Sequence, residues 1–306
     1  MKLVFKTPAK INLGLRILGK RGDGYHELET LLQMIGLYDE LEMEPTNSDI
    51  EFECDTPGIP TDESNLVLQA ARLLRNRYPE RTRAGVRIRL RKTIPSGAGL
   101  GGGSGNAAGA LMGLNIFWNL ELTRPQLLQL APQLGADVAF FLFSSCALGR
   151  GRGELLESVQ PAKKFYVILI FPGFSVATAW VYGNLNLKLT NQQNNISILP
   201  NILSRSDIPR LGSSLQNDLE DVVIQRFPEI QTLKDRLQSA GAQGALMSGS
   251  GSAVFGLFEK FDPAKKAFAG LEKGSGQKFF LTETVSGFSE FLPEEIINYP
   301  RNLDPS

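Results

Sequence analysis

Several residue types are scarce in this chain of 306 residues, and each scarcity excludes a class of protein. Only two cysteines occur, Cys54 and Cys146, and they lie far apart in the sequence. Two lone cysteines predict reduced thiols in a cytosolic protein rather than a disulfide framework. His26 is the only histidine, so general-base catalysis by a histidine elsewhere in the chain is excluded.

An excess of charge is also missing. Lys plus Arg and Asp plus Glu each number 32, which gives a formal net charge of zero. This balance gives no support for a nucleic-acid or anionic-membrane partner. No apolar run approaches the roughly 20 residues of a membrane span, and the N-terminal M-K-L-V-F-K-T-P-A-K lacks the apolar core of a signal peptide. With 42% hydrophobic residues, we expect a packed globular protein that acts on small molecules.

Strand and helix patterns follow one another in an irregular order along the chain. Apolar runs or alternation predict strands at 3–5 and 11–17 (with Pro8 between them), 41–43, 50–52, 86–90, 166–171 and 279–284, and a strand–turn–strand unit over 245–258. Helical patterns occur at 64–79, 107–117, after Thr123, and at 215–227, 230–239 and 263–271, and polar residues predict a loop at 191–195. Because no regular βαβ rhythm is present, we predict an α+β fold. We expect a first domain over 1–155, a second over 156–288 and a loose tail over 289–306.

Seven glycines fall between Gly97 and Gly109, between a strand and an alanine-rich helix. Residues 97–102 fit G-x-G-x-x-G, but this dinucleotide-binding pattern needs a buried parallel strand before it. The preceding strand, 86–90, alternates with arginine, which is typical of an antiparallel sheet with one wet face. A flexible linker or a tight helix entry is a further alternative. A phosphate cradle, built from N–H groups and the positive end of the helix, is the interpretation that the residues favour.

A second glycine pattern is close to a different phosphate loop. Residues 14–21 read G-L-R-I-L-G-K-R, whereas the P-loop requires Ser or Thr after the lysine to bind magnesium. The segment is also a strand that runs into a turn. We interpret this near match as chance.

The glycine loop I-P-S-G-A-G-L-G-G-G-S-G-N-A-A, 94–108, resembles the ATP loop of the GHMP kinases. Three further segments carry the resemblance: P-A-K-I-N-L (8–13) with R-G-D-G-Y-H (21–26), L-G-A-D-V-A-F-F-L (134–142), and S-G-S-G-S-A-V-F (248–255). The resemblance implies two α+β domains, the first like domain 2 of ribosomal protein S5 and the second ferredoxin-like, with the active site between them. It also implies transfer of the γ-phosphate of ATP to the 2-hydroxyl of cytidyl-diphospho-methylerythritol, in the non-mevalonate isoprenoid pathway.

The same resemblance assigns a catalytic pair. Asp137 would accept or orient the proton of the substrate hydroxyl, and Lys10 would keep Asp137 ionised and stabilise the nascent alkoxide. Asn12 lies on the same strand face as Lys10 by the period of two and can share the site. The alternatives are ordinary: Asp137 as a helix N-cap, and Lys10 as a solvated strand lysine.

The remaining site residues are also implied by the resemblance. Tyr25 and His26 would hold the cytidine end, Lys92 would meet a phosphate or the nucleobase, and Thr178 and Tyr182 would form a wall of the substrate pocket. Turn packing, an exposed strand charge and a core helix are the respective alternatives. The ATP triphosphate would be wrapped by Pro95, Ser96, Gly97, Ala98, Gly99, Leu100, Gly101, Gly102, Gly103, Ser104 and Gly105. No metal-ligand cluster is present in the sequence, so Mg²⁺ is expected to arrive with ATP, within reach of Ser104.

The chain departs from the family pattern at three places. Ala139 stands where the family commonly has Pro, Gly105 where it has a second Ser, and Tyr182 where it has Phe. None of these removes a charge. Another GHMP kinase acting on a smaller alcohol, an NAD-dependent oxidoreductase and a non-enzymatic nucleotide-binding regulator remain as alternatives. We expect a monomer or weak dimer of the cytoplasm, or of the plastid stroma in a plant, although no transit peptide is seen.

Overall fold

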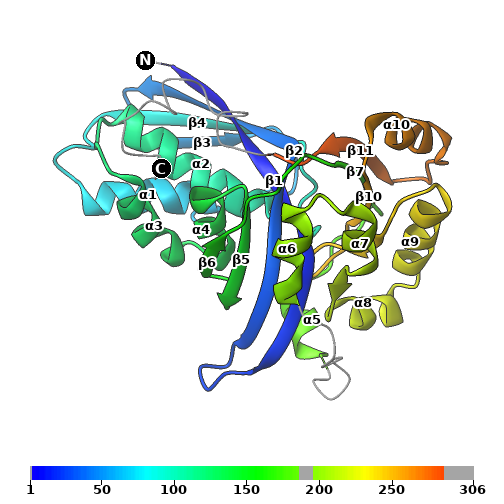
Figure 1. Ribbon diagram of the computed structural model, residues 1–306. Coiled ribbons are helices and arrows are strands. Elements are labelled where there is room, and N and C mark those ends of the chain that lie inside the picture. The colour runs from blue at the N-terminus through cyan, green and yellow to red at the C-terminus, as the bar shows by residue number, and fades with distance from the viewer. Residues whose placement is uncertain (1, 186–195, 286–306) are drawn as a thin grey trace.

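A computed structural model of the protein describes residues 2–185 and 196–285 and contains two sheets with helices packed on them. In Figure 1 the larger sheet and its helices occupy the left of the molecule, and the smaller sheet with α8 to α10 occupies the right. The predicted loop at 191–195 and tail at 289–306 lie outside the described residues. The irregular mixture of antiparallel pairs and helices confirms the α+β prediction.

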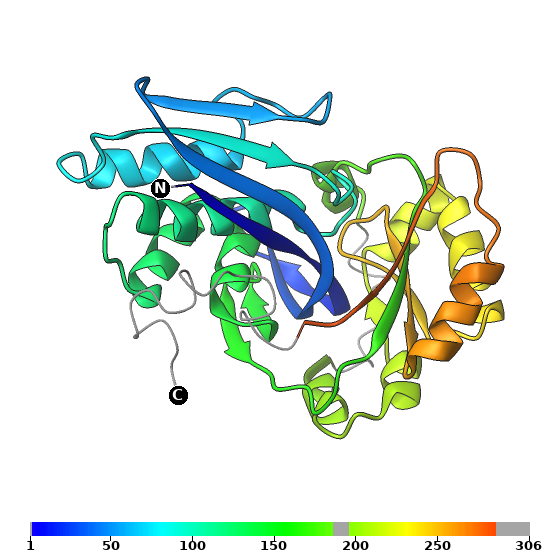
Figure 2. The ribbon, with the colours of Figure 1, turned by 90° about the horizontal axis from the view of Figure 1, so that it is seen from above.

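The larger sheet is ordered β3-β4-β2-β1-β8, with β5 also paired to β2 and β6 to β5. Its strands are β1 (Leu3–Lys20), β2 (His26–Thr46), β3 (Ile50–Cys54), β4 (Gly85–Arg91), β5 (Cys146–Gly151), β6 (Leu155–Ser158) and β8 (Gln216–Asn217). The helices on one of its faces are α1 (Leu66–Arg77), α2 (Gly102–Phe117), α3 (Arg124–Leu130), η1 (Ala131–Gln133) and α4 (Ala136–Phe143). Figure 2, a view from above, shows these helices together on one side of the sheet. Because β6 and β8 also belong to this sheet, the division of the chain near residue 155 stays a prediction.

A long hairpin of β1 and β2 forms the backbone of the larger sheet and projects beyond it at the bottom of Figure 1. The expectation of two short strands around Pro8 is wrong, because β1 is one strand of 18 residues. The register shifts between Pro8 and Ala9, and such a bulge accommodates a proline that cannot donate to the ladder. A turn after β1 closes the hairpin, with the Arg21 N–H bonded to the Tyr25 carbonyl.

The outer face of the larger sheet carries charges that neutralise one another. Strand β4 pairs antiparallel with β2, as the alternation at 86–90 predicts, but it pairs in parallel with β3 on its other side. Its three arginines meet glutamates of the neighbouring strands: Arg87 with Glu44 and Glu51, Arg89 with Glu42 and Glu53, and Arg91 with Glu40. The hydrophobic side of the sheet therefore faces the helices alone.

The smaller sheet is antiparallel and ordered β11-β7-β10-β9. Its strands are β7 (Tyr166–Phe171), β9 (Ala245–Met247), β10 (Val254–Phe258) and β11 (Lys278–Glu283). The helices of this half are α5 (Thr178–Gly183), η2 (Ile196–Ile198), α6 (Leu199–Ser204), α7 (Ile208–Ser213), α8 (Glu220–Arg226), α9 (Glu229–Ser239) and α10 (Phe261–Gly270). None of the helices in the described part of the chain is long and apolar enough to span a membrane.

The two faces of the smaller sheet bury different partners. Alternate residues of β7, Ile168 and Ile170, pack with Leu233 and Leu237 of α9. Val167 and Leu169, on the opposite face, belong to a core that includes Ile11 and Leu13 of β1. One hydrophobic core therefore joins the smaller sheet directly to the strand that carries Lys10. Both cysteines are free, as predicted.

Helix α2 lies unusually close to β1 because glycines face the strand. A Cβ at Gly109 would lie 2.4 Å from Thr7 Cγ2, and one at Gly113 would lie 2.6 Å from Phe5 Cζ. Glycine costs a helix about 1 kcal/mol relative to alanine, but here it permits the contact. The close approach brings the start of α2, and the loop before it, against the middle of β1.

Replacement of Gly109 by alanine should therefore destabilise the protein despite the better helix propensity. We expect Gly109→Ala to lower the free energy of unfolding by about 1–3 kcal/mol, because an extra methyl group overpacks the interface. Gly270→Ala is the matched control, since a Cβ there meets nothing within 4 Å. Urea titrations of both variants measure the difference, and equal stability of the two would contradict the close-packing explanation.

Candidate active site

A cavity of about 540 Å³ lies where the glycine loop, β1 and the turn after β9 meet. Of the predicted site residues it is lined by Lys10, Asn12, Lys92, residues 95–104, Asp137, Thr178 and Tyr182. Tyr25, His26 and Gly105 are not among its lining residues. The structure thus brings most of the predicted residues to one place, from both halves of the chain.

Four consecutive carbonyl groups of the glycine loop, those of residues 97–100, are bonded to groups elsewhere in the protein. Gly97, Gly99 and Gly101 have φ angles of 64°, 76° and 67°, a left-handed conformation that glycine adopts without strain. Each carbonyl from Gly97 to Leu100 accepts a hydrogen bond, from the Val176 N–H (3.3 Å), the Ala253 N–H (3.1 Å), the Ser248 hydroxyl (2.9 Å) and the Lys10 N–H (2.9 Å) respectively. The loop is therefore tied to β1 and to the smaller sheet at four consecutive residues.

The N–H groups of residues 97–101 have no acceptor within the described ranges of the chain. Helix α2 starts directly after them, at Gly102, with Gly101 as its N-cap. This start is earlier than the predicted 107, because Gly102 to Gly105 already form the first turn. A Cβ at Gly105 would lie 2.7 Å from the Pro8 carbonyl oxygen, so only glycine fits between the helix and β1. Successive N–H groups and a helix N-terminus converge here, which is the arrangement that binds phosphate.

Lys10 and Asp137 face each other at the end of this loop. The Lys10 Nζ lies 3.6 Å from Asp137 Oδ2 and 2.6 Å from Asn12 Oδ1. Lys10 is only 4% exposed, so the alternative of a solvated strand lysine is wrong. The N-cap of α4 is Gly135, so the alternative of Asp137 as an N-cap is wrong as well. Asp137 lies in the first turn of α4, where the helix dipole favours its negative charge.

The orientation of the Asn12 amide is fixed by a chain of hydrogen bonds. Asn12 Nδ2 donates to Thr30 Oγ1 at 2.8 Å, and the Thr30 hydroxyl donates to the Gly14 carbonyl at 2.7 Å. The amide oxygen of Asn12 must then face Lys10, because the amide nitrogen is engaged on the other side. Three buried polar groups therefore hold one ammonium group in place beside Asp137.

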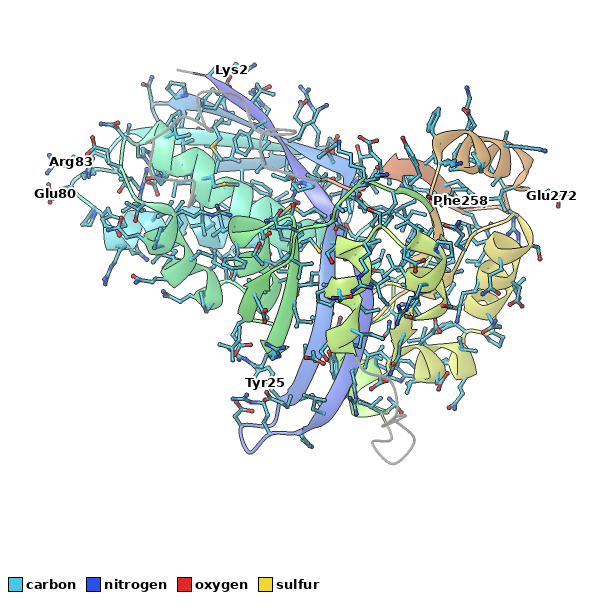
Figure 3. All side chains as sticks on the ribbon, in the orientation of Figure 1. Lys2, Tyr25, Glu80, Arg83, Phe258 and Glu272 are labelled. Atoms are coloured by element: carbon cyan, nitrogen blue, oxygen red, sulfur yellow. The ribbon has the colours of Figure 1, made fainter. Side chains whose placement is uncertain are left out.

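An aromatic group lies beyond the pair of Lys10 and Asp137, near the tip of the hairpin. The rings of His26 and Tyr182 have centroids 5.1 Å apart. Tyr25 is 58% exposed at the hairpin tip (Figure 3), and the guanidinium of Arg152 lies 4.8 Å from the centre of its ring. Burial, with a smaller effect of Lys20, lowers the pKa of His26 below its usual 6.5, which favours the neutral ring at pH 7. Burial and then the charge of Asp137 raise the pKa of Tyr182 to about 12.

Lys92 reaches the cavity but is held by a buried carboxylate. Its ammonium forms an ion pair with Asp39 and donates to Asn106 Oδ1 at 3.1 Å. Asp39 Oδ1 accepts the N–H groups of Thr93 and Ile94 at 2.7 and 2.8 Å, and Asp39 Oδ2 accepts Asn106 Nδ2 at 3.0 Å. The exposed-charge alternative for Lys92 is wrong, because its side chain is 6% exposed. A single carboxylate thus fixes the chain on both sides of the glycine loop.

Several lining residues were not predicted as part of the site. Arg152 and Gly153 directly follow β5, and Gly249 and Ser250 lie in the third glycine motif. A third set lies at the start of α1: Ile59, Pro60, Ser64, Asn65 and Leu66. The helical pattern predicted at 64–79 includes Asn65, which is the N-cap of α1 and accepts the Val67 N–H at 2.9 Å through its side chain. No local signal places that helix start opposite the glycine loop.

Comparison with known proteins places the chain in a family. Family models for the N-terminal and the C-terminal domain of GHMP kinases match residues 65–145 and 198–276. A 4-diphosphocytidyl-2-C-methyl-D-erythritol kinase of Syntrophus aciditrophicus is 44% identical over 279 residues, which span 91% of this chain and 98% of the relative. The chain belongs to the GHMP kinases. The GHMP kinase fold predicted from the motifs is confirmed, and the NAD-dependent alternative is excluded.

Further relatives of this GHMP kinase agree. A protein of the same name from Bacillus cytotoxicus is 41% identical, with 89% of this chain and 93% of the relative covered. A crystal structure of 4-(cytidine 5'-diphospho)-2C-methyl-D-erythritol kinase, 36% identical, superposes with a TM-score of 0.79 over 94% of this chain and 100% of that one. Homoserine kinase from Cytophaga hutchinsonii, at 22% identity and a TM-score of 0.74, shares the fold over 94% of this chain and 95% of its own.

Removal of the charge on Asp39 should be costly for stability. Asp39→Asn leaves the Lys92 ammonium buried without its carboxylate, and such a loss costs about 3–5 kcal/mol. Glu80→Gln is the matched control, since Glu80 and Arg83 form an ion pair whose side chains are 79% and 77% exposed (Figure 3). That change should alter the free energy of unfolding by no more than about 0.5 kcal/mol. Equal losses in urea titrations would mean that the Asp39 pair contributes no more than a surface pair.

Proposed function

We propose that this GHMP kinase transfers the γ-phosphate of ATP to the 2-hydroxyl of 4-diphosphocytidyl-2-C-methyl-D-erythritol. One observation carries the proposal. Lys10 and Asp137 are in contact next to the glycine loop, whose N–H groups at residues 97–101 have no acceptor within the described residues. The names of the relatives at 41–44% identity supply the substrate. The product would be the 2-phosphate of the substrate, together with ADP.

The glycine loop and the start of α2 would hold the triphosphate of ATP. The N–H groups of residues 97–101 are available, and the dipole of α2 adds to them. Gly103 opens to the cavity, since a Cβ there would meet only Leu66 Cδ1, at 3.8 Å. The unpredicted residues at the start of α1 line the same end of the cavity as this loop, so we propose that they contact the nucleoside.

Magnesium is expected to enter with ATP. The described residues contain no group of three or more His, Cys, Asp and Glu side chains that would hold a metal ion. The Ser104 side chain in the first turn of α2 lines the cavity, and its hydroxyl oxygen is a ligand of the kind that Mg²⁺ accepts. When bound, Mg²⁺ neutralises charge that develops on the phosphate oxygens.

Proton transfer and charge stabilisation would be divided between Asp137 and Lys10. The Asp137 carboxylate accepts the proton of the attacking hydroxyl, and the Lys10 ammonium stabilises the oxygen as its charge grows. The 2.6 Å hydrogen bond from Lys10 to Asn12 supports this role, because it holds the ammonium beside Asp137. With Asp137 as the general base, no phosphate oxygen of ATP has to take the proton of the hydroxyl.

The cytidine diphosphate portion would extend from Asp137 toward the hairpin tip. Thr178 and Tyr182 form the wall there, and the exposed ring of Tyr25 offers a stacking surface for a base. Arg152, which lines the cavity and lies over the ring of Tyr25, would supply a cation for the anionic diphosphate. A GHMP kinase for a smaller alcohol would not use this aromatic extension, which is why we favour the cytidyl substrate.

We place the protein in the cytoplasm for two reasons. ATP, the proposed donor, is used there, and free thiols such as those of Cys54 and Cys146 are typical of cytoplasmic proteins.

The substrate assignment is tested by ADP release. With the cytidyl substrate, turnover should require ATP and should exceed that with mevalonate or homoserine at equal concentration. The measurement is a coupled ADP assay on the unmodified protein. Faster turnover with either smaller alcohol would replace our substrate by a different one within the same family.

Asp137→Asn should abolish most turnover and leave ATP bound. Loss of a general base costs about 100- to 10,000-fold in kcat, whereas the carboxylate is not needed to hold the triphosphate. Asp235→Asn is the control, because Asp235 is exposed on α9 and bonds only Gln231 within the described residues. Calorimetry with a non-hydrolysable ATP analogue measures binding. Retained turnover in the Asp137 variant would remove the proposed base.

Lys10→Met should lower kcat more than ATP affinity. Methionine keeps the aliphatic stem that packs beside Gly101 but lacks the ammonium, and loss of such a charge-stabilising donor costs about 100- to 1,000-fold in kcat. Lys6→Ala, on an exposed position of the same strand, is the control. If the two variants turned over substrate equally fast, Lys10 would have no role in catalysis.

A further inference from the structure

A buried asparagine, Asn217, connects the catalytic strand to the third glycine motif without lining the cavity. Its residue lies in the short strand β8, which pairs in parallel with β1 at Gly14 and Leu15. The next residue, Asp218, reinforces the pairing, because its N–H bonds the Leu15 carbonyl at 3.0 Å and its carboxylate accepts the Ile17 N–H at 2.8 Å. Asn217 is therefore anchored to the strand that carries Lys10.

The amide nitrogen and the amide oxygen of the Asn217 side chain both bond backbone groups. Its Nδ2 donates to the Met247 carbonyl at 2.9 Å and to the Gly249 carbonyl at 2.7 Å. Its Oδ1 accepts the Leu219 N–H at 3.0 Å. The side chain thus grips both ends of the tripeptide Met247–Gly249. Because Asn217 is only 7% exposed, solvent has little access to these bonds.

Glu220 bonds the same tripeptide through the N–H of Met247. Its carboxylate accepts the Met247 N–H at 2.8 Å and pairs with Lys234 of α9. Met247 is consequently fixed through its N–H by Glu220 and through its carbonyl by Asn217. The segment that follows it has little freedom to shift.

The tripeptide in turn contacts the catalytic groups. The Ser248 hydroxyl donates to the Gly99 carbonyl at 2.9 Å and accepts the Asn12 N–H at 3.3 Å. A Cβ added at Gly249 would lie 3.3 Å from Lys10 Nζ and 3.2 Å from Asn12 Oδ1. Ser248 and Gly249 therefore form the wall against which the Lys10 ammonium and the Asn12 amide rest.

We propose that Asn217 is a positioning residue for phosphoryl transfer, which sets Lys10, Asn12 and the glycine loop relative to one another through the tripeptide Met247–Gly249. This inference rests on the proposed kinase function. Loss of the clamp lets the tripeptide, and with it the Lys10 ammonium, move from the reacting oxygen. A misplacement of about 1 Å costs roughly 100-fold in rate.

The variants are chosen to separate positioning from stability. Asn217→Ala removes the whole clamp. Asn217→Ser retains an oxygen that can accept the Leu219 N–H, but it is too short to reach Met247 and Gly249. Asn115→Ala is the matched control, because Asn115 is 2% exposed and makes two comparable bonds, to the Leu122 carbonyl (3.0 Å) and N–H (2.9 Å), at the far end of α2.

Steady-state kinetics with ATP and the cytidyl substrate give the first measurement. Both Asn217 variants should lose about 100-fold in kcat, with ATP affinity retained because the carbonyls of Gly97, Ala98 and Leu100 keep their own partners. Asn115→Ala should lose stability in urea but keep its kcat. The proposal is overturned if Asn217→Ser keeps its kcat, or if the Asn115 variant loses as much at equal stability.

Hydrogen–deuterium exchange gives a second measurement that needs no turnover. In Asn217→Ser the amides of Asn12 and of residues 248–251 should exchange faster than in the unmodified protein, whereas in Asn115→Ala the change should be confined to residues near 115–122. Unchanged exchange at Asn12 would overturn the clamp. Absent turnover in the unmodified protein, with faster exchange in the variant, would refute the kinase function and leave the clamp standing.

Discussion

The structure depends on the inward direction of four backbone carbonyls, those of residues 97–100. Each is bonded to a group outside the loop, one to β1 and three to the smaller sheet and its connections. A peptide whose carbonyl is bound on one side must present its N–H on the other. The free N–H groups that we propose as the triphosphate site are thus a result of long-range bonding. The glycines permit this conformation, but the partners select it.

Charge and amide groups that would be costly to bury are concentrated around this loop. Lys10, Asp39 and Asn217 are each less than 10% exposed, and the side chain of Lys92 is 6% exposed. Each of them bonds groups at or next to the cavity. Burial without partners would cost several kcal/mol for each group, so their arrangement is specific. The polar groups buried beside the cavity are therefore each held by specific partners.

The sequence predicted those features that depend on local pattern or on family motifs. The arginine alternation at 86–90 predicted the antiparallel strand, and the period of two placed Lys10 and Asn12 on one face. The sequence did not predict that β1 continues through Pro8. The proline is accommodated by a register shift against the partner strand β2, which leaves no mark in the sequence of β1. The early start of α2 was missed because glycine has low helix propensity, which tertiary packing overrides here. The partners of Lys92 and Asn217 are distant in sequence, and no periodicity links a residue to them.

The interlocking of the two glycine motifs also limits how this fold can be recombined. Gly99 leaves no room for a side chain, since a Cβ would lie 2.0 Å from the Ser248 carbonyl oxygen, so the backbones of the two halves are complementary at the level of single atoms. Consider a chimera of the N-terminal half of this chain with the C-terminal half of a distant homologue. It would also need the 247–253 turn and Asn217 from this chain, transferred together. The natural unit of exchange in this protein is therefore the pair of loops, and it does not coincide with either half of the chain.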